Sequence, residues 1–185
     1  STIVAGLERM SSHASSAIIT YTPAMADQLG LGAFEHKLYT SGARHVDTDR
    51  FRPERSYADR APLVGFVGRL DVEKGIPTLA AVAERLAPDI GFVFVGTGQF
   101  RDELETLLQE EIEAGHVEIT GWVGHERVAD ELNRLRLLVM PSEPTEGLPS
   151  TILESFACGT PVYSTPVSGV TDVVRIESEA VEVAI

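Results

Sequence analysis

The stretch LVGFVGRLDVEKGIPTLAAVAERL, residues 63–86, joins an apolar run to a helical pattern through a short charged loop. Its first part is rich in Val and Phe, which predicts a buried strand over Leu63 to Gly68. In its second part, apolar residues recur at helical spacing, which predicts a helix from Gly75 to Leu86. The stretch therefore predicts one β-α unit.

The same order of strand and helix repeats along the rest of the chain. Further strands are predicted at Gly91 to Gly96, Val117 to Val123, Leu137 to Ser142 and Pro161 to Thr165. Further helices are predicted at Arg101 to Ala114, Glu126 to Leu135 and Ser150 to Cys158, with another beginning over Gly169 to Arg175. Because the strands are near-continuous apolar runs, they are expected to be buried on both faces. We predict an α/β fold with a Rossmann-like, doubly wound parallel sheet.

The first part of the chain does not follow this repeat. Short strands are expected at Ala17 to Thr20 and Lys37 to Gly42, around a helix at Pro23 to Leu29. A piece of this size cannot close a core, so residues 1–42 are predicted to be the tail of another domain. Residues 43–62 are polar and predict an interdomain linker, and residues 63–185 form the main domain, which is expected to be truncated at its C-terminus.

Composition excludes several classes of function. The net charge of −13 argues against binding to a nucleic-acid backbone or to an anionic membrane surface. The sequence has no run of eighteen apolar residues, so no transmembrane segment is expected. Cys158 is the only cysteine and the histidines lack ligand spacing, so neither a disulfide nor a metal site is expected. A reducing, cytoplasmic location fits this composition.

The loop from Gly68 to Gly75, called the cation loop below, follows the first strand of the repeat. Gly68 allows close approach of a ligand to the backbone, and Arg69 and Lys74 place two cations before a helix N-terminus. This arrangement suits a diphosphate, because the helix dipole, free N–H groups and two positive side chains favour an anion. The alternative is that Arg69 and Lys74 only pair with Asp71 and Glu73.

The stretch EPTEGLPSTILES, residues 143–155 and called the acidic corner below, places Glu146 before a helix start and Glu154 within the helix. Pro149 fits the first turn, and the amides of Ser150, Thr151 and Ile152 are expected to point out of the helix end, where an anion can bind. The two carboxylates suit sugar hydroxyls. The corner therefore predicts a ligand with sugars at its ends and phosphate between them. The alternative is that both acids are solvated.

Two further loops carry weaker signals. GTGQF, residues 96–100, lacks the third glycine of a dinucleotide fingerprint, because Arg101 stands in its place, so a tight turn is the better interpretation. In GWVGHE, residues 121–126, Val123 and Gly124 offer backbone groups to a base and Trp122 offers a flat face. The favoured interpretations are that Trp122 belongs to the core and that His125 is a solvated loop residue.

Four segments, FVGRLDVEKG, FVGTG, ITGWV and PSEPTEGLPSTILESFACGTPV, together resemble the C-terminal domain of retaining GT-B glycosyltransferases, family 4 type. HVDTDRFRP, residues 45–53, resembles the family's interdomain linker. The resemblance covers about Ala14 to Val174 and implies a nucleotide-sugar donor, linked to UDP or GDP, as substrate, with no cofactor and no metal. It implies that a sugar, lipid or other acceptor, and any peripheral membrane contact, belong to the absent N-terminal domain.

The resemblance also implies roles for single residues. Arg69 and Lys74 match residues that hold the donor diphosphate and stabilise the leaving phosphate, and Glu146 matches the acid near the transferred sugar. Glu154 matches the acid that binds the ribose. The remaining donor-binding positions that match are Gly68, Val123, Gly147, Leu148, Ser150 and Thr151.

The sequence departs from the family at three places. His45 stands where a linker glycine is usual, Ser168 replaces one glycine of a pair, and Pro149 cannot donate an N–H. Without the acceptor domain, this chain alone is expected to bind the donor weakly and to be inactive in transfer. The alternatives are a nucleotide-sugar 2-epimerase of the same fold and a non-catalytic nucleotide-sugar-binding module. A glucan phosphorylase needs a lysine for pyridoxal phosphate, for which Lys37 and Lys74 are poor candidates, and an NAD-dependent oxidoreductase lacks its fingerprint.

Overall fold

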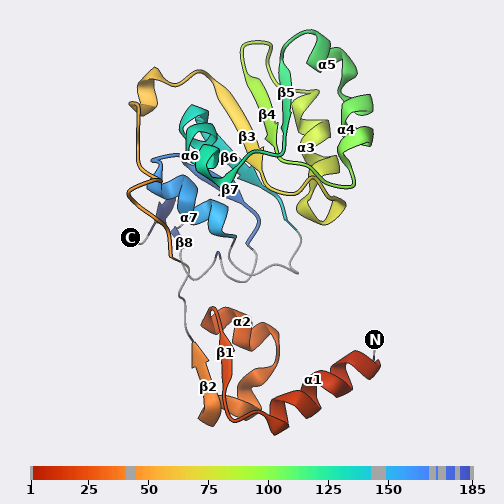
Figure 1. The fold of residues 1–185 in the computed structure, drawn as a ribbon, viewed down its shortest axis with the longest axis vertical. Coiled ribbons are helices and arrows are strands. Elements are labelled where there is room, and N and C mark those ends of the chain that lie inside the picture. Colours follow the sequence, from red (N-terminus) through yellow and green to blue (C-terminus); the bar gives the residue numbers. More distant parts are fainter. Residues whose placement is uncertain are drawn as a thin grey trace. The chain divides into compact units, whose positions relative to one another are not determined.

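The computed structural model describes residues 2–40, 45–142, 149–166, 170, 174–177 and 180–183. The chain divides into two compact units (Figure 1). The sheet unit contains residues 45–142 and 149–165. The smaller unit contains residues 2–40 and the described residues beyond 165.

The sheet unit is built on five parallel strands in the order β5-β4-β3-β6-β7. Their bounds are β3 Leu63–Val67, β4 Gly91–Val95, β5 Val117–Gly121, β6 Leu137–Met140 and β7 Val162–Ser164. The first strand, β3, is central, because Val64 pairs with Phe92 of β4 on one side and with Leu137 of β6 on the other. The strand order therefore reverses between β3 and β6, as in Rossmann-like sheets. The predicted α/β fold is confirmed.

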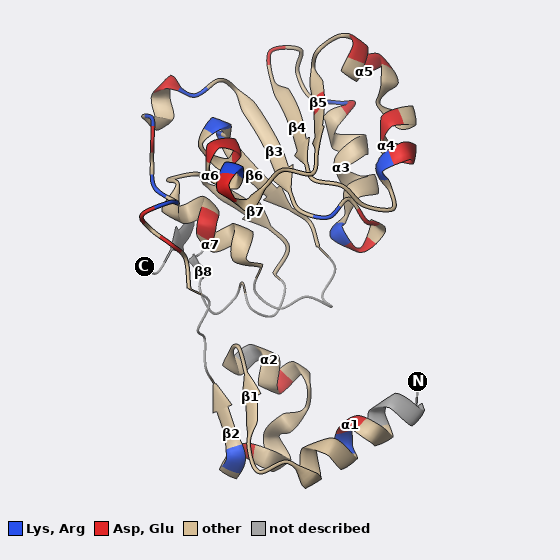
Figure 2. Ribbon diagram, in the orientation of Figure 1, with Lys and Arg blue, Asp and Glu red and all other residues tan. Residues whose placement is uncertain are grey.

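Helices cover both faces of this sheet. They are the 3-10 turn η3 Val72–Lys74 and the α-helices α3 Ile76–Ala83, α4 Arg101–Leu107, α5 Gln109–Glu113, α6 His125–Arg134 and α7 Ser150–Ala157. Because parallel crossovers are right-handed, the reversal in strand order sends α3, α4 and α5 to one face and α6 and α7 to the other (Figure 1). Acidic side chains predominate along α4 and α5 (Figure 2).

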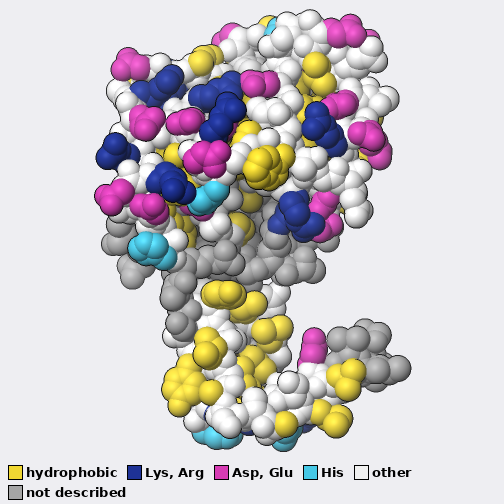
Figure 3. Space-filling view, viewed as in Figure 1, with side chains coloured by type: hydrophobic (Ala, Val, Ile, Leu, Met, Phe, Trp, Pro, Cys, Tyr) yellow, Lys and Arg dark blue, Asp and Glu magenta, His cyan; other side chains and the backbone are white. Residues whose placement is uncertain are grey.

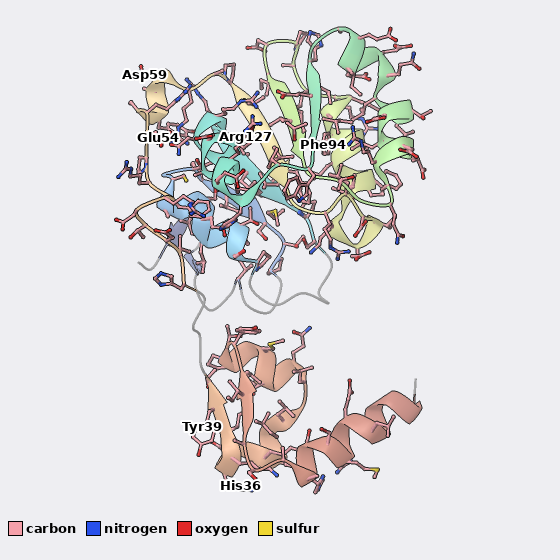
Figure 4. The ribbon with its side chains drawn as sticks, in the orientation of Figure 1. His36, Tyr39, Glu54, Asp59, Phe94 and Arg127 are labelled. Atoms are coloured by element: carbon pink, nitrogen blue, oxygen red, sulfur yellow. The ribbon has the colours of Figure 1, made fainter. Side chains whose placement is uncertain are left out.

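The core of the sheet unit is apolar and aromatic. Phe92 and Phe94 of β4 are buried with ring centroids 4.5 Å apart, and Phe94 is labelled within the sheet in Figure 4. Gly65 of β3 leaves room for Leu135, because a Cβ added at Gly65 would lie 2.6 Å from Leu135 Cδ2. The apolar strand runs that predicted two buried faces thus enclose a packed core.

The segment predicted as a linker is largely part of the sheet unit. Residues 45–62, called the strap below, include the 3-10 turn η2 Tyr57–Asp59 and contribute the buried Phe51. The side chain of Asn133 holds the strap: its Oδ1 accepts from Glu54 N at 2.9 Å and its Nδ2 donates to Arg52 O at 3.0 Å. Glu54 and Asp59 mark the course of the strap in Figure 4.

Arg60, near the end of the strap, is 2% exposed and ties three segments together. Its Nη1 donates to Leu135 O at 2.9 Å and also to Thr160 Oγ1, and its Nη2 donates to Cys158 O at 2.7 Å. Cys158 is the residue that ends α7. The strap therefore fixes the C-terminal end of α7 against the end of α6.

The smaller unit contains few elements. They are α1 Thr2–Ala14, β1 Ile18–Thr20, α2 Pro23–Gln28, the 3-10 helix η1 Leu31–Lys37, β2 Leu38–Thr40, and the antiparallel pair β8 Val174–Glu177 and β9 Ala180–Val183. β1 and β2 are parallel, and their register partners Ile19 and Tyr39 are 70% and 59% exposed. Hydrophobic side chains are prominent on the visible face of this unit (Figure 3). Such exposure agrees with a piece too small to close a core.

The structure corrects two predictions of secondary structure. The helix predicted over Arg101 to Ala114 is interrupted at Leu108, whose φ of −107° and ψ of 22° are not helical. Leu108 is fully buried, so packing overrides the continuous helical pattern. Val174 and Arg175 lie in strand β8 rather than in the predicted helix, in agreement with the β-branched residues around them.

Candidate functional site

The reversal in strand order places the cation loop beside the segment that leaves β6. The cation loop leaves the carboxyl end of β3, and the segment from Pro141 leaves the carboxyl end of β6. A Cβ added at Gly75 would lie 2.5 Å from Pro141 O, so the two segments touch. Gly75 also has a φ of 75°, which favours glycine. Crevices at such points are where open α/β sheets bind ligands.

The cation loop is also joined to the loop after β4. Gly68 N donates to Val95 O at 2.9 Å, Leu70 N donates to Thr97 O at 3.0 Å, and Phe100 N donates to Leu70 O at 2.8 Å. A Cβ added at Gly96 would lie 1.9 Å from Gly68 O. Gly96 thus allows two backbones to pack closely, and hydrogen bonds join the loops that follow β3 and β4.

Arg69 makes the ion pairs that the sequence offered as an alternative. Its Nη1 contacts Asp71, and its Nη2 lies 3.1 Å from Glu73 Oε1. Asp71 is buried, and its Oδ1 also accepts from Gln99 N at 2.9 Å. The Arg69 side chain is nevertheless 64% exposed and that of Glu73 is 48% exposed, and an ion pair between exposed groups contributes about 0–1 kcal/mol. A multiply charged anion can therefore compete for this guanidinium.

Lys74 ends η3 and is half-buried beside Arg69. Burial lowers the pKa of the Lys74 ammonium and the Arg69 guanidinium lowers it further, whereas Glu73 and Asp71 oppose the shift. A partly desolvated cation next to a second cation is stabilised by an incoming anion. The electrostatics of the cation loop thus suit a diphosphate.

The structure describes only the second half of the acidic corner. Glu146, Gly147 and Leu148 lie outside the described residues. α7 begins at Ser150 after Pro149, and Ser150 and Thr151 are half-buried in its first turn. The prediction that the amide of Ile152 is free is wrong, because Ile152 N donates to Pro149 O at 3.2 Å. The helix start itself takes up that donor.

Glu154 is buried in the second turn of α7, with 8% of its surface exposed. The alternative that this carboxylate is merely solvated is therefore wrong. A buried acid on the helix that follows β6 is a candidate for ligand binding, because burial of a carboxylate needs polar partners. The segment after α7 is held by Ser155 Oγ, which donates to Thr160 O at 3.0 Å.

The prediction for Trp122, which follows β5, is wrong. The indole was expected in the core, but Trp122 is 77% exposed. β5 ends at Gly121, whose φ of 74° turns the chain, and Val123 behind it is half-buried. His125 is exposed, as predicted, but stands in the first turn of α6 with its ring 5.4 Å from that of Phe51.

Sequence reasoning missed Ser142, just beyond β6. It is 2% exposed, and within the described part of the chain its Oγ has no hydrogen-bond partner. Thr165 Oγ1 donates to its carbonyl at 2.6 Å. A serine that follows an apolar strand run carries no signal that separates it from an ordinary loop serine, which is why it was overlooked.

Two further features are absent from the described residues. No group of three or more His, Cys, Asp or Glu side chains there is placed to hold a metal ion. No helix there has the length and apolar character needed to cross a membrane.

Comparison with known sequences gives a consistent family. The family model described as glycosyl transferases group 1 matches residues 61–184. The 2-deoxystreptamine N-acetyl-D-glucosaminyltransferase of Streptomyces fradiae is 37% identical over 118 residues, which cover 61% of this chain and 28% of that protein. The GDP-mannose-dependent alpha-mannosyltransferase of Corynebacterium glutamicum is 36% identical over 142 residues, which cover 72% of this chain and 32% of that protein. The chain thus spans about a third of the length of these curated relatives, whose names favour a transferase over an epimerase.

Solved structures agree in fold. Sucrose-phosphate synthase from Thermosynechococcus elongatus matches with a TM-score of 0.80 and 26% identity, covering 95% of this chain and 47% of that one. A TarM mutant from S. aureus, solved in complex with UDP, matches with a TM-score of 0.75 and 20% identity. This match covers 89% of this chain and 33% of that one. At that identity the second match supports the fold alone.

Proposed function

This chain belongs to the glycosyl transferases group 1 family, and on that premise we propose that it is the donor-binding half of a retaining, metal-independent glycosyltransferase. The donor is a hexose linked to UDP or GDP. The acceptor, a sugar, a lipid or another hydroxyl compound, binds through the other half of the GT-B fold, and the protein acts in the cytoplasm. One observation carries the proposal: the cation loop and the helix of Glu154 flank the reversal in strand order.

In this proposal the cation loop binds the diphosphate and drives its departure. The backbone at Gly68 allows close approach, and Arg69 and Lys74 contact the phosphate oxygens. When the bond between sugar and phosphate breaks, negative charge grows on the leaving diphosphate. Two fixed cations stabilise that charge more strongly than they stabilise the ground state, which lowers the barrier.

The remaining positions orient the donor. The carboxylate of Glu154 accepts hydrogen bonds from the ribose hydroxyls, and Val123 meets the base. Glu146 contacts the transferred sugar, and the backbone at Gly147, Leu148, Ser150 and Thr151 cradles sugar and phosphate. Each charge-assisted contact of this kind contributes about 1.5–3 kcal/mol.

Calorimetric titration of this chain with UDP and GDP, extended to millimolar nucleotide, tests the proposal. We expect at least one of them to bind, and Arg69→Ala to weaken binding by about 10- to 100-fold. Arg85→Ala is a matched control, because Arg85 is exposed and lies beyond α3, away from the carboxyl ends of the strands. The proposal fails if neither nucleotide binds, or if Arg69→Ala binds as tightly as the unmodified chain.

A further inference from the structure

Trp122 is an exposed aromatic side chain with no role in the core. It is the only tryptophan in the sequence, and 77% of its surface is accessible. It follows β5 directly, at the same carboxyl edge of the sheet from which the cation loop leaves β3. A large exposed aromatic at a ligand-binding edge points to contact with a flat ligand group.

Glycines lie along the carboxyl edge of the sheet between the cation loop and Trp122. Gly68, Gly96 and Gly121 stand at the ends of the adjacent strands β3, β4 and β5, and Gly96 forms a bridge with Gly121. Two inter-strand spacings amount to roughly 10 Å. A nucleoside diphosphate whose phosphates lie at the cation loop extends over a comparable distance to its base.

Arg101 lies beside the same turn. Its Nη1 is 2.9 Å from where a Cβ on Gly121 would stand, so the glycine makes room for the guanidinium. Its Nε donates to Glu105 Oε1 at 2.8 Å, and among the described residues its Nη groups have no acceptor. These donors lie beside Gly121, the residue that precedes the exposed Trp122. Uracil and guanine both present carbonyl oxygens that accept hydrogen bonds from a guanidinium.

We propose that Trp122 stacks on the nucleobase of the donor and that Arg101 donates to the edge of that base and sets the preference for the base. The inference rests on the proposed function and adds two contacts to it. Stacking on an aromatic side chain accepts any base, because every base has a π face. Discrimination between uracil and guanine therefore comes from Arg101, whose paired donors fit O6 and N7 of guanine.

The fluorescence of Trp122 tests the stacking without any substitution. The chain is titrated with UDP, GDP and pyrophosphate, and quenching of the indole by acrylamide is measured at each saturating concentration. We expect both nucleotides to shield the indole from acrylamide at least twofold, and we expect pyrophosphate to bind without shielding it. Unchanged quenching at saturating nucleotide overturns the inference.

Variants separate stacking from folding. Trp122→Ala is expected to weaken nucleotide binding by about 5- to 100-fold while leaving pyrophosphate affinity unchanged, and Trp122→Phe is expected to restore most of the loss. Tyr163→Ala is the matched control, because Tyr163 is 71% exposed on β7, at the opposite edge of the sheet. Arg101→Met is expected to change the ratio of GDP to UDP affinity by about 5- to 100-fold.

The outcomes distinguish this inference from the function on which it rests. If the unmodified chain binds neither nucleotide nor pyrophosphate, the proposed function fails and the base contacts fail with it. If nucleotides bind with an unshielded indole, or if Trp122→Ala binds them with unchanged affinity, only the base contacts fail. An unchanged ratio of GDP to UDP affinity in Arg101→Met removes the role of that residue.

Discussion

Two arginines flank the central strand, and their surroundings are opposite. Arg60 precedes β3, is 2% exposed, and donates to backbone carbonyls and a hydroxyl. Arg69 follows β3, has a side chain that is 64% exposed, and pairs with two carboxylates. The amino end of the sheet therefore uses its cation to join segments of the protein, whereas the carboxyl end holds its cation where an anion can reach it.

This difference shows at which end of the sheet an arginine can exchange its protein partner for a ligand. Burial lowers the pKa of the Arg60 guanidinium, and removing this side chain takes the donor away from the carbonyls of Leu135 and Cys158. The pair of Arg69 with the exposed Glu73 contributes little, so a phosphate can replace Glu73 as a partner of this guanidinium. Substitutions at the two ends should consequently affect different properties, stability at one and binding at the other.

The largest effect is expected at the carboxyl end. If the proposed function holds, Lys74→Ala in a preparation that contains both halves of the GT-B fold should lower kcat for sugar transfer by about 100- to 1000-fold, because a fixed charge at the leaving group is lost. The free energy of unfolding should change little. Initial rates and denaturant unfolding measured on the same preparations check this, with Arg85→Ala as the control. A loss of stability that matches the loss of rate would contradict a functional role for Lys74.

At the amino end, Arg60→Met should lower the free energy of unfolding by about 3 kcal/mol, because buried acceptors at Leu135, Cys158 and Thr160 lose their donor. Urea unfolding followed by circular dichroism measures this. Nucleotide affinity of the folded fraction should change less than stability does. If Arg60→Met unfolds at the same urea concentration as the unmodified chain, the strap does not depend on this residue.

A smaller effect is expected from pH. Because the pKa of Lys74 is lowered by burial, its charge is lost at a lower pH than that of an ordinary lysine. As pH rises through that lowered pKa, UDP or GDP affinity should fall. The contribution of Lys74 to stability should rise over the same window, since there the unfolded chain holds the proton and the folded chain does not. Titrations between pH 7 and 10 check the affinity, and Lys74→Arg should remove the alkaline decrease.

The smallest effect concerns the reactivity of Cys158, whose backbone carbonyl accepts a hydrogen bond from Arg60. Burial raises the pKa of this thiol to about 11, so it stays protonated at pH 8. Iodoacetamide should label the native chain far more slowly than the unfolded chain, as followed by mass spectrometry. Rapid labelling of the native chain would show that the amino end of the sheet opens, against the contrast drawn between the two ends.

The β-α repeat was predictable because its signals are local. A strand such as Gly91 to Gly96 is marked by its own apolar run, and a helix such as Ile76 to Ala83 by its own helical spacing of apolar residues. Arg69 and Lys74 lie in the loop between one such strand and helix. The order of the strands is a property of the whole sheet and is absent from any one segment. The contact between Gly75 and Pro141 follows from that order and became visible only in the structure.

Trp122 and Leu108 were misjudged for related physical reasons. Trp122 is of a residue type common in cores, and Leu108 sits in an unbroken helical pattern. The exposure of Trp122 accompanies its place just beyond the end of β5, and the break at Leu108 accompanies its full burial. Arg60, within the segment predicted as a polar linker, is buried and donates to partners distant in sequence, such as Cys158. Average preferences of residue types fail where a distant partner, or the place of a residue at the end of a strand, determines its environment.

The reversal in strand order also has a consequence for folding. β3 can pair with β4 after a short loop and helix, but its other neighbour, β6, is synthesised only after β4, α4, α5, β5 and α6. Closing longer loops costs more entropy, so we expect β3, β4 and β5 to associate first and β6 and β7 to join later. The contact between Gly75 and Pro141 then forms only at this later stage, so a chain halted before β6 lacks one side of the proposed donor site.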